Sequence, residues 1–236
     1  MALPKLDTPT FDYTLPVSQI PVTFRPFLVK EEKLLLVGKE ANVAQQVNAM
    51  KQVLSNVIIS PVNLELEKLP SVDLEMLFVQ LRAKSVQNVV ELQYRDKEDN
   101  EVYKFNIDLE ELEPTIDPDH SNEIALDKDL TIELRDPDIG VMTQAGMNVG
   151  EGDDIDNEEI FKLIAGCIVK VYDKENVYDD FTKKEAIDFV KSFDIKRFEK
   201  LREFFDTLPK LTYELNYVNK NKNKRKIVLT GVSDFF

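Results

Sequence analysis

The side chains in this sequence that could catalyse a reaction do not stand in a recognisable catalytic pattern. His120 is the only histidine, which excludes a histidine-based triad and a metal site built from several histidines. The residues 117–121 around it resemble the beginning of a calcium loop. However, Asn122 stands where that loop needs glycine, and Lys128 stands where it needs glutamate. We therefore expect no calcium site.

The single cysteine is expected to be structural. Cys167 falls on the apolar face of a predicted helix, whereas a reactive thiolate needs a basic and partly exposed setting. One cysteine forms no internal disulfide, which suits a reducing compartment. The 44 aspartates and glutamates are so numerous that no one pair is informative. A carboxylate-dependent hydrolase stays open only if a cleft brings two acids together. We predict a protein that is not an enzyme and that holds neither cofactor nor metal.

Composition and charge narrow the possible partners. The chain has 236 residues, 43% hydrophobic and 31% charged, which is typical of a globular protein. Its net charge of −14 argues against binding the nucleic-acid backbone. No apolar run approaches the roughly 20 residues of a membrane helix, and the first ten residues lack the apolar stretch of a secretory signal. We expect protein partners, no nucleic acid and no membrane.

The first half predicts an arm, two helices and a small sheet. Alternating apolar residues interrupted by prolines predict an extended arm or hairpin over residues 1–27. A helix is expected over about 28–57, either continuous or interrupted near Gly38, with Leu36, Leu54 and Val57 on one apolar face, and an antiparallel partner begins at Pro70. Alternation then predicts a hairpin over 90–109, joined by an acidic connector to a third strand at 130–134.

The second half predicts helices closed by a hairpin. Glycines and prolines over 137–156 suggest a flexible linker, without the pattern of a phosphate-binding loop. Capping patterns follow at Asp156, Thr182 and Asp194, and the first of these helices carries an apolar face from Ile160 to Val171. A hairpin over 213–229 has a basic turn, which is expected either to be solvated or to attract the acidic connector.

Together these elements predict an α+β fold with four parts. The expected parts are the arm at 1–27, the helical pair with its antiparallel sheet at 28–136, the linker at 137–156 and the helices with the terminal hairpin at 157–236. The chain ends in Phe235 and Phe236, whose rings are expected either to fill the protein's own core or to anchor a partner.

Three stretches carry a resemblance to a known family. They are RPFLVKEEKLLL at 25–36, LPSVDLEMLFVQLRAKSV at 69–86 and FFDTLPKLTYELNYVNKNKNKRKIVLTGVSDFF at 204–236. In this order they resemble the baseplate hub assembly proteins of T-even-type contractile-tailed bacteriophages, and the segments between them are also similar. Many relatives look as if they carry cysteine pairs, resembling a zinc ribbon, in the last hairpin. Residues 219–226 of this chain contain no cysteine, so zinc is not implied here.

The resemblance implies a non-enzymatic role in building the baseplate hub, as an assembly chaperone or as a minor structural subunit. Implied partners are other hub proteins or the tape-measure protein, with a homo-oligomer also open. Implied locations are the host cytoplasm during assembly and the virion tail baseplate. Our candidate partner-binding residues lie at the start of the first helix and at the chain end: Arg25, Phe27, Lys30, Glu31, Glu32, Phe235 and Phe236.

One alternative comes from a different functional class. The net charge and the acid-rich stretch 108–138 would also suit a decoy that mimics DNA and occupies a host DNA-binding protein. Such a mimic should place its carboxylates along one exposed face, spaced like phosphates. A structure that scatters or pairs these carboxylates would count against it.

Overall fold

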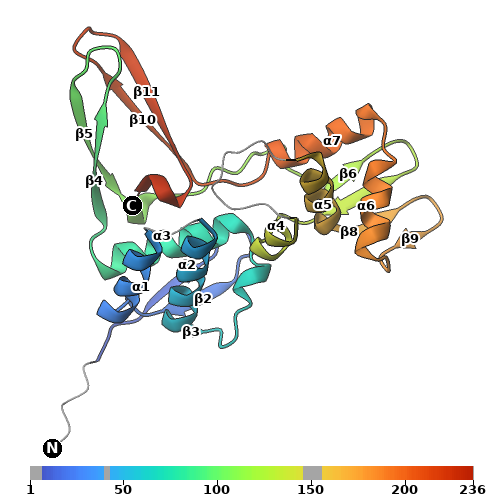
Figure 1. Ribbon diagram of the computed structural model, residues 1–236, viewed down its shortest axis with the longest axis horizontal. Coiled ribbons are helices and arrows are strands. Elements are labelled where there is room, and N and C mark those ends of the chain that lie inside the picture. The colour runs from blue at the N-terminus through green and yellow to red at the C-terminus, as the bar shows by residue number, and fades with distance from the viewer. Residues whose placement is uncertain (1–6, 40–42, 146–155, 236) are drawn as a thin grey trace, which may run out of the picture. The chain divides into compact units, whose positions relative to one another are not determined.

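The computed structural model describes residues 7–39, 43–145 and 156–235, and it has the α+β fold that the sequence predicts. The chain forms two compact units. Unit 1 comprises Met1–Leu66, Val72–Thr115 and Lys210–Phe236, and unit 2 comprises Glu67–Ser71 and Ile116–Pro209. Helices and strands of both units are labelled in Figure 1.

These ranges differ from the four parts expected from the sequence. The terminal hairpin belongs to unit 1 with the first half of the chain, and unit 2 is largely an insertion between Thr115 and Lys210. Those two residues form an isolated antiparallel bridge, with each backbone N–H donating to the carbonyl oxygen of the other at 2.9 and 3.1 Å. The expected flexible linker is in part a helix, α4 (Ile139–Ala145), while residues 146–155 lie outside the described chain.

The predicted N-terminal arm is a hairpin in a three-stranded antiparallel sheet. Strands β1 (Phe11–Thr14), β2 (Pro21–Phe24) and β3 (Ile58–Ser60) lie in that order. Leu15, Val22 and Phe24 are fully buried, so burial of apolar side chains holds this segment in unit 1.

The helix expected over 28–57 is interrupted, as the alternative near Gly38 allowed, and forms two helices. They are α1 (Val29–Lys39) and α2 (Val43–Val57), which pack against each other, and α3 (Ser71–Ser85) follows. Leu54 and Val57 are buried as predicted, but Leu36 is 62% exposed. The rotational phases of two separate helices are independent, so Leu36 of α1 does not lie on the buried face that Leu54 and Val57 of α2 share.

Two predicted hairpins are confirmed in unit 1. Strand β4 (Val89–Arg95) pairs with β5 (Val102–Asp108), and β10 (Thr212–Val218) pairs with β11 (Lys224–Thr230), each as an antiparallel two-stranded sheet. The hairpins stand side by side (Figure 1), and the Tyr217 ring lies 4.7 Å from Tyr103 and 5.4 Å from Phe105. The short helices η2 (Leu109–Glu111) and η3 (Val232–Phe235) follow β5 and β11.

Unit 2 is built on a four-stranded antiparallel sheet in the order β6-β7-β8-β9. Its strands are β6 (Glu123–Ala125), β7 (Thr131–Leu134), β8 (Ile168–Tyr172) and β9 (Val177–Tyr178). The strand expected at 130–134 therefore pairs here, and not with the hairpin β4–β5. Alternation in a sequence identifies a strand but does not choose its neighbour.

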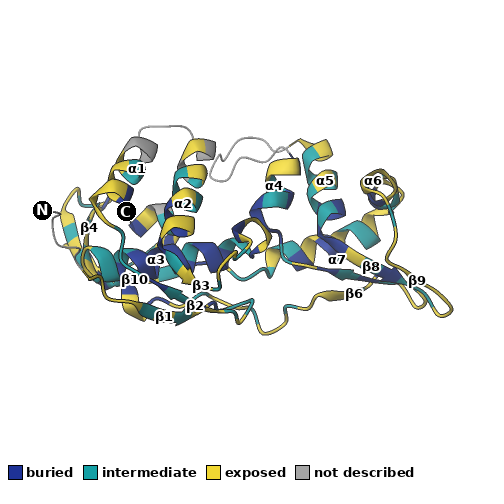
Figure 2. Ribbon diagram, turned by 90° about the horizontal axis from the view of Figure 1, so that it is seen from below, coloured by how far each residue is buried: buried dark blue, intermediate teal, exposed yellow. Residues whose placement is uncertain are grey.

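Three capped helices cover the core of unit 2. They are α5 (Asn157–Cys167), α6 (Lys183–Lys191) and α7 (Ile195–Asp206), and their predicted caps Asp156, Thr182 and Asp194 are confirmed. Figure 2 shows α5 exposed where it begins and buried toward its end. Val171, expected on the first of these helices, lies in β8 because that helix ends at Cys167.

The short helix η1 (Leu66–Lys68) precedes α3. Among the described residues, no helix is both long and apolar enough to cross a membrane.

Candidate partner-binding surfaces

The start of α1 is organised by a buried ion pair. Arg25 Nη2 lies 3.1 Å from Glu31 Oε1, and Leu28 N donates to Glu31 Oε2 at 2.8 Å. Arg25 also donates to the carbonyl oxygen of Asn56 at the end of α2. Burial of the Glu31 carboxyl opposes its ionisation, but the hydrogen bonds from Arg25 and Leu28 outweigh it and lower its pKa. Both charged residues thus hold unit 1 together.

The other candidates near α1 differ in their accessibility. Phe27 is half-buried, and its N–H donates to Ser85 Oγ of α3 at 3.0 Å. Lys30 is 71% exposed although it lies 3.4 Å from Glu31, and Glu32 is exposed. A partner that contacts this helix would therefore meet Lys30 and Glu32, and it would not reach the buried carboxylate of Glu31.

The aromatic end of the chain fills the protein's own core. Phe235 is 1% exposed and packs in a buried cluster with Leu109 of η2 and Leu229 of β11. Of the two roles considered, the burial of Phe235 supports the core role. Phe236 lies outside the described residues.

The tips of the two hairpins are joined by a charged network within unit 1. Arg225 Nε lies 3.3 Å from Asp96 Oδ2, and Arg225 Nη1 lies 3.1 Å from Glu98 Oε2. Tyr217 donates its hydroxyl proton to Asp96 at 2.7 Å. The backbone hydrogen bond from Glu98 N, with those of Tyr217 and the charge of Arg225, lowers the pKa of the Asp96 carboxyl against the effect of burial.

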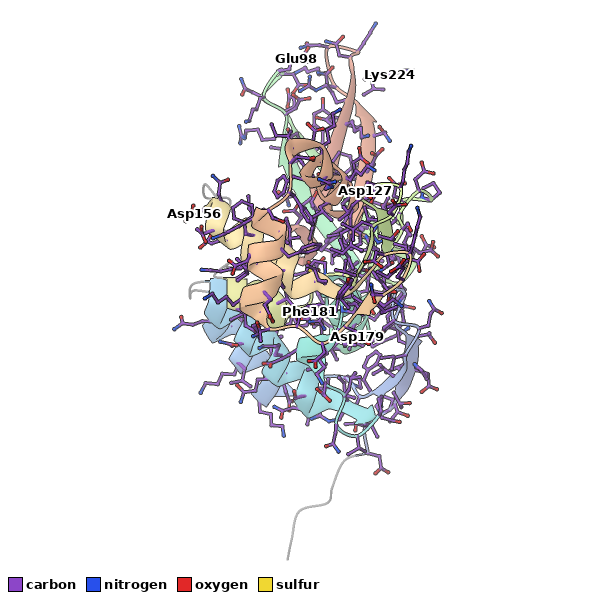
Figure 3. The ribbon with its side chains drawn as sticks, turned by 90° about the vertical axis from the view of Figure 1, so that its right-hand side faces the viewer. Glu98, Asp127, Asp156, Asp179, Phe181 and Lys224 are labelled. Atoms are coloured by element: carbon purple, nitrogen blue, oxygen red, sulfur yellow. The ribbon has the colours of Figure 1, made fainter. Side chains whose placement is uncertain are left out.

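A second carboxylate extends this network. Asp99 accepts from Tyr103 Oη at 2.7 Å and from the backbone N–H of Lys220 at 2.9 Å, while Lys220 Nζ is paired with Glu101. Burial and the hydrogen bond to Asp99 raise the pKa of Tyr103 to about 12. Glu98 and Lys224 mark this end of the unit in Figure 3.

The basic turn is therefore neither simply solvated nor bound to the connector 108–127. Its partner is the acidic turn between β4 and β5, which contains Asp96 to Glu101. Sequence reasoning missed this contact, although the opposite charges of the two turns were a usable signal. Both turns end long aromatic strands, and packing of Tyr217 against Tyr103 brings the tips together.

The residues considered for chemistry are engaged in the structure. Burial raises the pKa of the Cys167 thiol to about 12, so the thiolate form is disfavoured. His120 lies between Thr207 Oγ1 and Asp136 Oδ1, at 3.0 and 3.4 Å, and its ring packs on Phe204. Within the described part of the chain, no three potential ligands are grouped to hold a metal ion.

The acids of the stretch 108–138 are divided between the two units, and several are paired with bases. Lys84 pairs with Glu110 at 2.7 Å in unit 1. In unit 2, Arg197 lies 2.8 Å from Asp127, Lys170 lies 2.6 Å from Glu133, and Arg135 lies 3.1 Å from Asp138. Carboxylates paired in this way carry less of the exposed negative charge that a DNA mimic would present.

Comparison with known proteins identifies the family. A family model described as T4 bacteriophage base plate protein matches residues 8–236, which is nearly the whole chain. No curated protein and no solved structure matches the chain. The family match includes both units, the charged network and the start of α1. The chain belongs to the T4 bacteriophage base plate protein family.

Proposed function

We propose that this base plate protein acts without catalysis in assembly of the baseplate hub, as an assembly chaperone or as a minor structural subunit. Its partners would be other hub proteins or the tape-measure protein. It would act in the host cytoplasm during assembly, and as a subunit it would remain in the virion tail baseplate. The family match supports the setting, and the hub role goes beyond that match.

The observation that supports a non-enzymatic role most directly is the engagement of the chemically capable groups. The Cys167 thiol is buried, and His120 is held between two hydrogen-bonding partners on an aromatic ring. Asp96 and Glu31 are fully buried and ion-paired. Groups held in this way stabilise a fold and leave its exposed surface to recognise partners.

The DNA-mimic alternative receives less support. A mimic needs unpaired carboxylates along one face, whereas Asp127, Glu133 and Asp138 each lie within ion-pair distance of a base. The stretch that motivated the idea also belongs to two separate units.

A deletion phage would test the proposal. We expect phage lacking this gene to accumulate incomplete tails, and we expect the wild-type chain supplied in trans to restore contractile tails. Mass spectrometry of purified virions would then separate the two forms of the role, because a chaperone leaves and a subunit stays. Complete contractile tails from the deletion phage would refute an assembly function.

A matched pair of variants would test the start of α1. Exchanging the charges of the exposed residues Lys30 and Glu32 (K30E with E32K) should reduce complementation if this surface contacts a partner. The control exchanges Lys196 and Glu199 (K196E with E199K), which are exposed on α7. Equal complementation by both variants would remove this part of α1 from the candidate surface.

A further inference from the structure

The two hairpins of unit 1 leave long strand edges open. Each belongs to a sheet of only two strands, so all four seven-residue strands are edge strands. Open edges present unpaired N–H and C=O groups to which another extended chain can bind. The edge strands of the other two sheets have at most four residues.

The hydrogen-bond register shows which groups point outward along β11. Gly231 N donates to Leu211 O, and Asn219 N donates to Asn223 O, so odd-numbered residues form the hydrogen-bonded pairs of this hairpin. The N–H and C=O groups of Lys224, Lys226 and Val228 must then point away from β10. Consistently, the next such N–H, that of Thr230, is bound by the Asp234 carboxylate at 2.7 Å.

The edge of β11 is open from Lys224 to Val228, before the N–H of Thr230 that Asp234 occupies. Of the described residues, none donates to or accepts from the outward backbone groups of Lys224, Lys226 and Val228. The edge of β10 is occupied where it begins, because Thr115 bridges Lys210. Strand β11 is also fixed in place by its other side chains, because Arg225 binds Asp96 and Glu98 and Leu229 is buried.

Charge distinguishes β11 from the other three strands. Its outward residues carry two lysines and no acid, whereas β4 and β5 each carry both signs and β10 carries one glutamate. Pairing with β11 of a second copy, in a register centred on the lysines, would place lysines opposite one another, which destabilises a sheet. An incoming strand with an acid opposite Lys224 would instead gain a favourable pair, and an acid opposite Lys226 would share a lysine whose Nζ already pairs with Glu214 of β10. Val228 is 49% exposed and would favour an apolar residue opposite it.

We propose that the edge of β11 from Lys224 to Val228 is a docking site for an acidic extended segment of a partner protein, which adds as a strand. The segment would place two acids and one apolar residue at alternate positions. This inference deepens the proposed function, because it names the kind of partner that an assembly protein would bind.

The test uses the full-length protein labelled with ¹⁵N and a synthetic capped peptide in which glutamates alternate with threonines, with a valine two residues from one glutamate. We expect the peptide to slow hydrogen exchange at the amides of Lys224, Lys226 and Val228 by at least about tenfold. A peptide with lysine in place of glutamate should give no protection, and neither should one N-methylated at alternate amides, because it cannot form the ladder.

Two valine variants form a matched pair. Val228→Pro removes an outward N–H from β11, and Val218→Pro removes one from β10, where the side chain is 58% exposed. Proline is tolerated where a strand's N–H faces solvent. We expect only Val228→Pro to abolish protection at Lys224 and Lys226. If the proline variants do not fold, Lys224→Glu should weaken binding of the acidic peptide at least about tenfold and favour the lysine peptide.

Several results would overturn the proposal. These are no protection at millimolar peptide, equal effects of the two proline variants, protection that arises from self-association without peptide, or protection by a single-stranded DNA oligonucleotide and not by the peptide. The outcome is independent of the deletion phage. If the peptide does not bind but the deletion phage makes defective tails, only the docking site on β11 is refuted. If the peptide binds but the deletion phage makes normal tails, the assembly role is refuted.

Discussion

Asp73 connects segments that lie far apart in the sequence. It is fully buried in the first turn of α3, and its two carboxylate oxygens accept hydrogen bonds from Val17 N and Ser18 N, each at 2.9 Å. This contact fixes the turn between β1 and β2 on the helix. Removing a buried acceptor leaves its donors unsatisfied, which is more damaging than losing an exposed hydrogen bond.

We therefore predict that Asp73→Ala lowers the free energy of unfolding of unit 1 by about 3 kcal/mol, because two charge-assisted hydrogen bonds are lost. Urea denaturation followed by tyrosine fluorescence would measure it. The control is Asp12→Ala, which removes an exposed acceptor of Thr23 Oγ1 and should change stability by less than about 1 kcal/mol. Similar losses in the two variants would contradict the role given to Asp73.

Glu75, two residues further along α3, is a carboxyl group whose ionisation is opposed by burial. Its pKa is raised from 4.5 to about 7 by burial. Its Oε1 lies 3.9 Å from the position that a Cβ on Gly231 would occupy, next to η3. A raised carboxyl pKa means that the folded state binds the proton more tightly than the unfolded state does. This contribution to stability is full below pH 4.5 and is lost as pH rises toward 7.

Glutamine does not ionise, so the variant Glu75→Gln should not lose this contribution to stability as pH rises toward 7. We predict that its free energy of unfolding, relative to wild type, rises between pH 4.5 and 7 and then stays level, with a gain of up to ~3 kcal/mol. Urea denaturation at a series of pH values measures the difference. Glu111→Gln, at an exposed position of η2, should show no such rise. An equal pH dependence in both variants would rule out Glu75 as its source.

At the scale of elements, the short helix η3 closes the core beneath the two hairpins. Its Phe235 packs with Leu109 and Leu229, while Asp234 caps the edge of β11 through Thr230 N. Helix η3 therefore stabilises η2 and β11, by burying Phe235 against both and by the hydrogen bond from Thr230 N to Asp234.

Phe235→Ala should lower the free energy of unfolding of unit 1 by about 3–5 kcal/mol, because a buried ring is replaced by a cavity. Val29→Ala, at a position that is 82% exposed, should change it by less than about 0.5 kcal/mol. Thermal unfolding monitored by circular dichroism would measure both. A stable Phe235→Ala protein that fails to complement the deletion phage would instead restore the partner-anchor role.

At the scale of the whole molecule, unit 2 is largely an insertion into unit 1. The chain leaves unit 1 at Thr115 and returns at Lys210, and these residues share a two-hydrogen-bond bridge. Chain ends that lie this close can be rejoined by a short link without strain.

We predict that a chain joining residue 115 to residue 210 through two glycines retains the fold of unit 1, and that the fragment 116–209 retains that of unit 2 without its short segment Glu67–Ser71. Each should unfold cooperatively, and the amide spectrum of each should overlay on the corresponding part of the intact protein. The control joins residue 136 to residue 157, across the range expected to be a linker, and should disrupt unit 2 because α4 is lost. Failure of the 115–210 joined chain to fold would contradict the division.

The sequence by itself determined the local elements of this protein. Side-chain periodicity identified both hairpins, and the capping residues Asp156, Thr182 and Asp194 marked three helix starts. These signals are local, since they depend on residues a few positions apart. The family resemblance was also readable from the sequence, because ordered stretches of residues carry it.

Tertiary structure alone decided which elements are neighbours. It placed the strand Thr131–Leu134 in a sheet of unit 2, Leu36 on the surface and the basic turn against Asp96 and Glu98. Each of these depends on residues far apart in the sequence, and a strand's pattern says which face is buried without saying what pairs with its edge. For the same reason, only the tertiary structure shows that β11 pairs with β10 along one edge and leaves its other edge open.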